Sequence, residues 1–174
     1  MNFQIVPMNL EFARAILEWT YDGPYAVYNY DKSAGHLLDA GKWGSTLFAV
    51  LDESGSLAGE LTLGFLNAAG DWVPQADMDA GKLDGCILWI GFGMRPNLTG
   101  RGLGLDFVNA CVDFSARTVR ERCRYTGAEI GLRVFQFNQR AVKVYERAGF
   151  VTFEEICRII EGKEYPALLM KKKL

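Results

Sequence analysis

The stretch Trp89–Leu105, WIGFGMRPNLTGRGLGL, constrains the fold of this 174-residue chain more than any other. A near-continuous apolar run over Gly85–Met94 predicts a strand that is buried on both faces. Pro96 ends that strand, and three glycines follow at alternate positions, Gly100, Gly102 and Gly104. Apolar residues then recur at three- and four-residue spacing from Leu103 to Val119, which predicts a long amphipathic helix.

The glycine loop predicts a binding site for phosphate. Glycines let successive backbone N–H groups turn toward one point without interference from a Cβ atom. The helix that follows adds unpaired N–H groups and partial positive charge at its N-terminus, and Arg101 adds a formal charge. A Rossmann GxGxxG beginning at Gly100 or Gly102 lacks its last glycine, and the GK[ST] of a Walker A loop occurs nowhere. A turn that only packs the helix on the strand is the alternative.

A second pattern lies in Leu132–Phe150, LRVFQFNQRAVKVYERAGF. A strand over Glu129–Phe137 precedes Asn138, which can cap a helix that runs to Ala148. Ala141 and Tyr145 are four residues apart, so they share one face of that helix. Gly149 follows at the position where a left-handed residue commonly ends a helix, and Phe150 begins the next strand.

In this order the two blocks resemble those of the GNAT superfamily of acetyl-CoA-dependent N-acetyltransferases, whose motifs read (Q/R)xxGx(G/A) and, roughly, NxxAxxxYxxxGF. The second block is complete here, whereas the first keeps Gly102 and Gly104 but has Thr99 at the Gln/Arg position. The resemblance covers about Cys86–Phe150. It implies one α/β (α+β) domain over residues 1–174, with a central, mixed, mostly antiparallel sheet, splayed parallel strands and flanking helices. More loosely, WTYDGPYAVYNYD is similar to the branch that includes the ribosomal-protein N-terminal acetyltransferases.

The resemblance also implies that acetyl-CoA binds as co-substrate, without a metal. Pantetheine and the acetyl group would contact the end of the buried strand, at Ile90, Gly91, Phe92, Gly93 and Met94. A backbone N–H near residues 90–92 would polarise the thioester carbonyl. The pyrophosphate would lie on the loop formed by Thr99, Gly100, Arg101, Gly102, Leu103 and Gly104. Asn138 would steady the cofactor or the helix start, and Tyr145 would protonate the leaving thiolate.

The sequence points less clearly to the general base and the acceptor site than to the cofactor site. Glu60 and Asp84 are candidate bases acting through water, although an exposed carboxylate at a strand end is the simpler interpretation of both. The family places its acceptor between the early helical region and the later strands, which gives the candidates Tyr21, Tyr25, Tyr28 and Asp31. Aromatic faces and carboxylates suit a cationic amine, but tyrosines here could equally cover an edge of the core. The lone histidine, His36, could act as a base or simply lie at the surface.

Periodicity and turn signals predict the remaining elements. Asn9 is expected to cap a helix that ends at Trp19, and the turn Glu161-Gly162-Lys163 to join the last two strands. Asn67–Asp84, rich in Gly, Pro and Asp, is expected to be a loop, and the tyrosine-rich segment 21–31 is too irregular to predict an element. The Lys-rich end is expected to be a solvated tail. Strands are expected over Phe3–Pro7, Ser45–Leu51, Ser56–Phe65, Phe150–Ile160 and Tyr165–Met170.

Composition and charge exclude several classes of function. With 19 Lys and Arg against 21 Asp and Glu, the chain lacks the basic surface of a nucleic-acid binder. No apolar run is long enough to span a bilayer and no signal peptide is evident, so a cytoplasmic protein without membrane contact is expected. A single histidine excludes a HExxH metal site. The four widely spaced cysteines are expected to be reduced and mostly buried.

The sequence therefore predicts an enzyme that moves an acetyl group from acetyl-CoA to a primary amine. The acceptor would be a small molecule or a protein N-terminus, which attacks directly in a ternary complex. One alternative is a module of the same fold that binds acyl-CoA without turnover, and another is an unrelated nucleotide-binding domain. A homodimer is compatible with the family, but no feature of the sequence specifies an interface.

Overall fold

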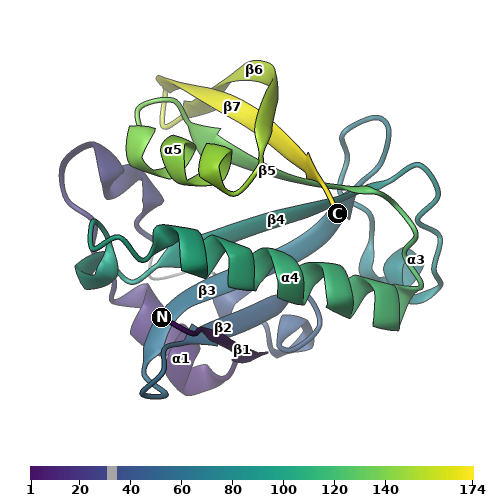
Figure 1. Ribbon diagram of the computed structural model, residues 1–174, viewed down its shortest axis with the longest axis horizontal. Coiled ribbons are helices and arrows are strands. Elements are labelled where there is room, and N and C mark those ends of the chain that lie inside the picture. Colours follow the sequence, from purple (N-terminus) through teal and green to yellow (C-terminus); the bar gives the residue numbers. More distant parts are fainter. Residues whose placement is uncertain (31–34) are drawn as a thin grey trace. The chain divides into compact units, whose positions relative to one another are not determined.

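The computed structural model describes residues 1–30 and 35–174 of the chain. They fall into two compact units, Met1–Thr62 with Phe92–Ala110 and Leu63–Gly91 with Cys111–Leu174. Two strands, β3 (Leu57–Leu66) and β4 (Ile87–Met94), and the helix α4 (Gly104–Cys123) contribute residues to both units. Hydrogen bonds order the seven described strands as β1-β2-β3-β4-β5-β7-β6 (Figure 1). The single domain over residues 1–174 stays a prediction.

The first unit is built on the antiparallel strands β1 (Gln4–Pro7), β2 (Leu47–Leu51) and β3. The helix α1 (Leu10–Leu17) starts as predicted, because the side chain of Asn9 accepts a hydrogen bond from the Phe12 N–H at 2.8 Å. One face of this helix packs on β2 to form the core of the unit. The buried residues of that core are Met8, Ala13, Ile16, Leu17, Leu37, Leu47 and Ala49.

The tyrosine-rich segment of the first unit, left without a predicted element, is also ordered. It forms a 3-10 helix over Gly23–Tyr28, which Pro24 can begin because the first turn of a helix leaves its N–H groups unpaired. The short helix α2 (Gly35–Leu38) and a 3-10 turn over Ala40–Lys42 follow. Asn29 fixes the end of the segment, since its side chain accepts a hydrogen bond from the Tyr21 N–H at 2.7 Å.

The second unit holds the C-terminal half of the sheet. There β4 pairs in parallel with β5 (Glu129–Phe135), β5 pairs antiparallel with β7 (Lys163–Lys173), and β7 pairs antiparallel with β6 (Val151–Ile160). Helix α5 (Gln139–Arg147) lies beside these strands (Figure 1). Within the described residues β4–β5 is the one parallel strand pair. The predicted α+β class with a mixed, mostly antiparallel sheet is confirmed.

Two connections in the second unit differ from the prediction. The segment expected as a loop over Asn67–Asp84 contains a short helix, α3 (Gln75–Asp79). Helix α4 continues beyond the predicted Val119 to Cys123, and Arg124 then takes the left-handed conformation, with φ of 51°, in which helices commonly end. No helix of the described residues is both long and apolar enough to cross a membrane.

Three predictions about burial are wrong. In β4 only Leu88–Ile90 are buried, because the glycines at 91 and 93 carry no side chain to cover the strand. Of the four cysteines only Cys111 is buried, and Cys157 is exposed on β6. The Lys-rich end continues β7, where Lys172 Nζ donates a hydrogen bond to the Ala148 carbonyl at the end of α5 at 2.7 Å. A cation is favoured at that end of a helix.

Candidate active site

Among the described residues, Glu60 is the one acidic or basic side chain that is buried. Glu60 lies within β3 with only 4% of its surface exposed. Its carboxylate accepts hydrogen bonds from the Tyr30 hydroxyl at 3.0 Å and the Thr62 hydroxyl at 3.3 Å. The backbone N–H of Gly93 in β4 is a third donor. The interpretation of Glu60 as an exposed strand-end carboxylate is therefore wrong, because its side chain points into the unit between β3 and the end of β4.

Burial sets the protonation of this carboxyl. It raises the pKa of Glu60 from 4.5 to about 7, although the three hydrogen bonds act in the opposite direction. Near neutral pH the group therefore exists in both its neutral and its charged form. A carboxyl in that state can accept and return a proton, which is the requirement for a general base at physiological pH.

Two tyrosines stand beside Glu60. The Tyr21 hydroxyl donates a hydrogen bond to the Met94 carbonyl at 2.7 Å. A Cβ atom on Gly93 would lie 3.1 Å from Glu60 Oε1 and 3.6 Å from the Tyr21 oxygen, so both side chains approach this glycine. Burial and the nearby Glu60 carboxylate raise the pKa of Tyr21 and of Tyr30, so both phenols remain hydrogen-bond donors. The ring of Tyr28 packs edge-on against Tyr21, with 6.4 Å between centroids.

The other residues that the sequence gave as candidates for the acceptor site or the base are Tyr25, Asp31 and His36. Tyr25 is half-buried within the 3-10 helix, and Asp31 lies outside the described residues. His36 packs its ring against Tyr30 at 5.4 Å, and burial, aided by Lys42, lowers its pKa. Sequence reasoning did not single out Tyr30 or Thr62 as partners of Glu60. Position 62 could have been found, because residues two apart in a strand share one face.

The glycine loop of the first unit has the conformation that its sequence predicts. Gly100 and Gly102 have φ of 75° and 80°, in the left-handed region that glycine adopts without strain. The first hydrogen bond of α4 runs from the Phe107 N–H to the Leu103 carbonyl at 3.1 Å. The N–H groups of the first turn, at 104–106, therefore have no partner inside the helix.

These residues fit a phosphate group. The backbone at Gly100, Arg101 and Gly102 is exposed, and a Cβ atom built on Gly102 meets nothing within 4 Å. The unpaired N–H groups and the positive end of α4 supply donors and charge. The Thr99 hydroxyl donates to the Pro96 carbonyl at 2.8 Å, so it closes the preceding 3-10 turn, Pro96–Leu98.

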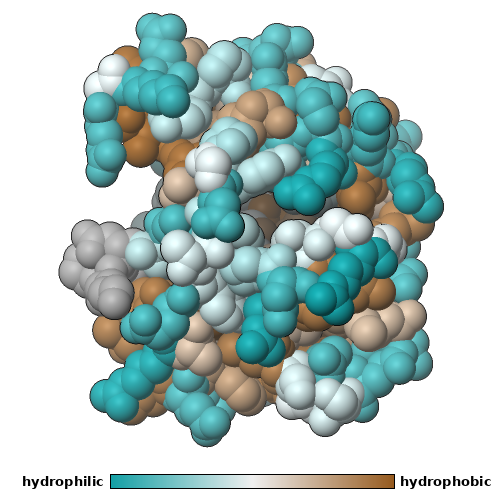
Figure 2. All heavy atoms as spheres, turned by 90° about the vertical axis from the view of Figure 1, so that its left-hand side faces the viewer, coloured by the Kyte–Doolittle hydropathy of each residue, from teal (hydrophilic) through white to brown (hydrophobic). Residues whose placement is uncertain are grey.

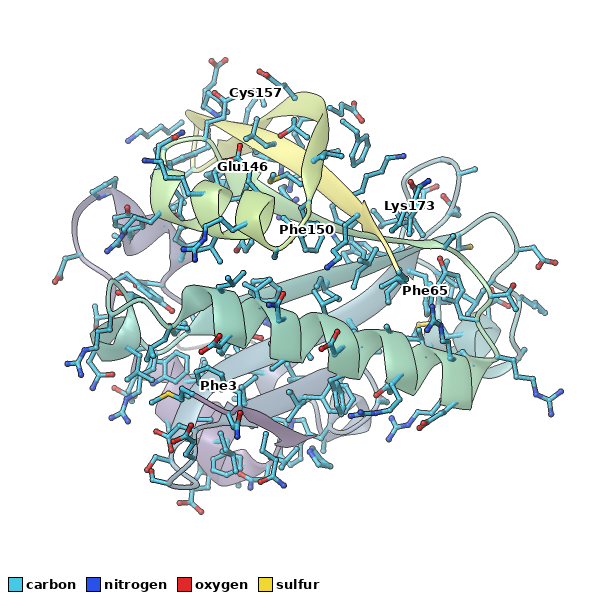
Figure 3. All side chains as sticks on the ribbon, in the orientation of Figure 1. Phe3, Phe65, Glu146, Phe150, Cys157 and Lys173 are labelled. Atoms are coloured by element: carbon cyan, nitrogen blue, oxygen red, sulfur yellow. The ribbon has the colours of Figure 1, made fainter. Side chains whose placement is uncertain are left out.

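The remaining predicted residues belong to the second unit. Ile90 is buried and Gly91 is exposed on β4. Asn138 caps α5 as predicted, since its side chain accepts a hydrogen bond from the Ala141 N–H at 3.2 Å. Tyr145 is half-buried on α5, with its ring 6.2 Å from that of Phe150, which Figure 3 shows next to the helix. Asp84 is exposed at the rim of a cavity of about 480 Å³, as the simpler interpretation expected.

Comparison with known proteins identifies the family that the two sequence motifs resemble. The sequence profile described as the acetyltransferase (GNAT) family matches residues 10–150. A search of curated proteins found none that matches the chain.

Solved structures share the fold at low sequence identity. A chimera of the spermidine N-acetyltransferase SpeG from Vibrio cholerae and hSSAT is 17% identical, with a TM-score of 0.69 over 99% of this chain and 96% of that one. The spermidine/spermine N-acetyltransferase SpeG from Vibrio cholerae, in complex with manganese ions, is 16% identical, with a TM-score of 0.65 over 99% and 92%. Arabidopsis thaliana NAA60 in complex with acetyl-CoA is 18% identical, with a TM-score of 0.62 over 99% of both chains.

Proposed function

Because the chain belongs to the acetyltransferase (GNAT) family, we propose that it transfers an acetyl group from acetyl-CoA to a primary amine by direct attack in a ternary complex. The observation that carries the proposal is the buried Glu60 carboxyl, held by Tyr30 and Thr62 with a pKa of about 7. A family member that only bound acyl-CoA would not need a proton acceptor poised near neutral pH.

Glu60 acts as the general base. A primary amine is mostly protonated at pH 7, and it must lose a proton before its lone pair can attack a carbonyl. Glu60 takes that proton through one water molecule, since its own surface is almost fully covered. The Tyr30 and Thr62 hydroxyls hold the carboxylate in place, and the aromatic rings of Tyr21 and Tyr28 line the approach of a cationic amine.

Acetyl-CoA supplies the acetyl group as a thioester. The pyrophosphate is held by main-chain N–H groups of the loop Thr99–Gly104, with Arg101 at its edge. A backbone N–H at 90–92 polarises the carbonyl, and Asn138 keeps the start of α5 in place. As the new C–N bond forms and the C–S bond breaks, the Tyr145 hydroxyl protonates the leaving thiolate. The second proton of the attacking nitrogen then replaces the one that Tyr145 gave up, and Glu60 passes the first proton on to water.

The acceptor is a primary amine of a small molecule or of a protein N-terminus. An α-amino group has a pKa of about 7.7–8.0, close to that of Glu60, whereas a lysine-like amine at about 10.4 gives up its proton less readily. The looser similarity of the tyrosine-rich segment to ribosomal-protein N-terminal acetyltransferases also supports an N-terminal α-amine. The spermidine named for two structural neighbours makes an aliphatic polyamine the natural comparison in an assay.

The first experiment is calorimetric titration with acetyl-CoA, with ATP and NAD as controls, followed by a screen of peptides and polyamines for release of the CoA thiol. Exposed Cys157 reacts with thiol reagents, so a Cys157→Ser background gives a clean baseline. We expect saturable binding of acetyl-CoA alone and amine-dependent thiol release. Binding with no thiol release for any amine would instead support a non-catalytic acyl-CoA-binding module, and binding of ATP or NAD alone would refute both.

Variants then test the assigned roles. Glu60→Gln should lower kcat/KM by about 10²–10⁴-fold, whereas Glu164→Gln, an exposed matched control on β7, should have no effect. A loss in Asp84→Asn and not in Glu60→Gln would move the base to Asp84. Tyr145→Phe should lower kcat and leave acetyl-CoA affinity nearly unchanged, and an unchanged kcat would remove Tyr145 as the acid.

A further inference from the structure

Strand β6 forms an edge of the sheet and is exposed along its length. It pairs only with β7 in the hydrogen-bonded order of the described strands. Its exposed apolar side chains include Val151 at 62%, Phe153 at 45% and Ile159 at 70%. Figure 2 shows hydrophobic atoms among hydrophilic ones at the surface of the β6–β7 hairpin, and Figure 3 shows Cys157 on the outer part of this strand.

Little in β6 protects such an edge from pairing with another strand. The strand is ten residues long and contains no proline, and its one register shift, between Thr152 and Glu154, lies near its start. Natural proteins usually shield a long edge with proline, a short strand, a bulge or charged side chains, because unpaired N–H and C=O groups are a template for another chain. Of these devices the region 154–160 has only charged side chains, Glu154, Glu155 and Arg158. The region 154–160 therefore offers a regular, open edge.

The charges on this edge are arranged symmetrically. Glu154 stands two residues before Ile156, and Arg158 stands two residues after it. If a second copy pairs antiparallel with the first so that the two Ile156 residues face each other, each Glu154 lies opposite an Arg158. The same register places Phe153 beside Ile159. Opposite charges and apolar side chains facing each other across strands both favour pairing.

We propose that β6 is a homodimer interface, in which two copies of the chain pair antiparallel through their β6 edges about a two-fold axis at Ile156. An interface of this kind uses the same surface on both copies, so one Glu154–Arg158 contact is formed twice. The charges favour this register, because a shift by one residue would no longer place each Glu154 opposite an Arg158. This proposal does not depend on the acetyl-transfer reaction.

Sedimentation of the full chain over a range of micromolar concentrations tests the proposal. We expect a species of twice the 19.4 kDa chain mass. Arg158→Glu should raise the dimer dissociation constant at least about tenfold, because like charges then face each other twice. Adding Glu154→Arg to that variant should restore the dimer, since the pairs re-form with their signs exchanged. Arg120→Glu, an exposed charge reversal on α4, should leave the dimer intact.

Disulfide trapping tests the register independently of charge. In a Cys157→Ser background, Ile156→Cys should form a covalent dimer on mild oxidation, because opposed residues of antiparallel strands lie about 4.5–5.5 Å apart between Cα atoms. Ser54→Cys, in the exposed turn between β2 and β3, is the control and should not. A monomer at all concentrations, a dimer unaffected by Arg158→Glu, or equal cross-linking of both variants would overturn the proposal.

Discussion

The buried Glu60 carboxyl should make the stability of the protein depend on pH. The folded state binds a proton at this group with a pKa of about 7, whereas the unfolded chain binds it at 4.5. That difference corresponds to about 3 kcal/mol of unfolding free energy. Because the folded pKa is the higher one, the contribution is fully present below pH 4.5 and is lost as the pH rises through 7.

Urea denaturation of the wild type and of Glu60→Gln at pH values from 4.5 to 8.5 measures this effect. The side chain of Gln keeps the shape of the carboxyl group and does not titrate, and all other ionisable groups are common to both proteins. We expect the unfolding free energy of the wild type to fall relative to Glu60→Gln by about 3 kcal/mol across this range and to level off above pH 8. The amide introduced by Glu60→Gln also alters hydrogen bonds, but this changes the unfolding free energy of the variant by the same amount at every pH.

The difference between the two curves decides the result. A flat difference from pH 5 to 8 would show that the Glu60 pKa is not raised, and would remove the physical basis for its role as a base near neutral pH. A depressed pKa, as expected for a carboxylate that is paired with a cation, would instead make the difference rise with pH only below about pH 5.

Four further variants test residues of the first unit. Tyr30→Phe removes a hydrogen bond that favours the charged carboxyl, so the acidic limb of the pH–kcat/KM profile should move to higher pH. Gly102 and Gly55 have φ of 80° and 79°, and no atom lies within 4 Å of a Cβ added to either. Replacing either with Ala should lower the unfolding free energy measured in urea by about 1 kcal/mol, but calorimetry should show weaker acetyl-CoA binding only for Gly102→Ala. Gly59→Ala should cost about 1–3 kcal/mol in the same denaturation assay, because its Cβ would meet the Phe107 ring at 2.5 Å and the Gly93 carbonyl oxygen at 2.7 Å. An unchanged value would mean that both the ring and the β4 backbone give way freely.

The sequence predicted correctly those local conformations that depend only on residues a few positions away. Asn9 and Asn138 both cap the helices predicted for them, since a cap depends on amides only three residues away. The left-handed conformation of Gly149 was predictable for the same reason, because this residue follows the C-cap of α5.

The environment of Glu60 could not be read from the sequence. Its neighbours Tyr30 and Gly93 are 30 and 33 residues away along the chain. The pairing of β3 with β4 brings Gly93 to Glu60, and the segment that follows the 3-10 helix brings Tyr30. A carboxylate in a strand is usually exposed, so residue type alone favoured the wrong placement. The Lys-rich end was predicted as a solvated tail for the same reason. Its pairing in β7 and the contact of Lys172 with the end of α5 both depend on residues far away in the sequence.

The lack of a cation beside Glu60 among the described residues leads to a last prediction. Among the described residues, the groups that lower the pKa of Glu60 are three hydrogen-bond donors and no cation, although buried carboxylates are usually paired with one. An acceptor ammonium would supply that charge, lower the pKa of Glu60 and release a proton near pH 7. Calorimetric titration of an accepted amine at pH 7 in two buffers of different ionisation enthalpy should therefore show proton release by the wild type and none by Glu60→Gln. Equal proton release by both proteins would mean that the amine binds away from Glu60, and the base would have to be sought elsewhere.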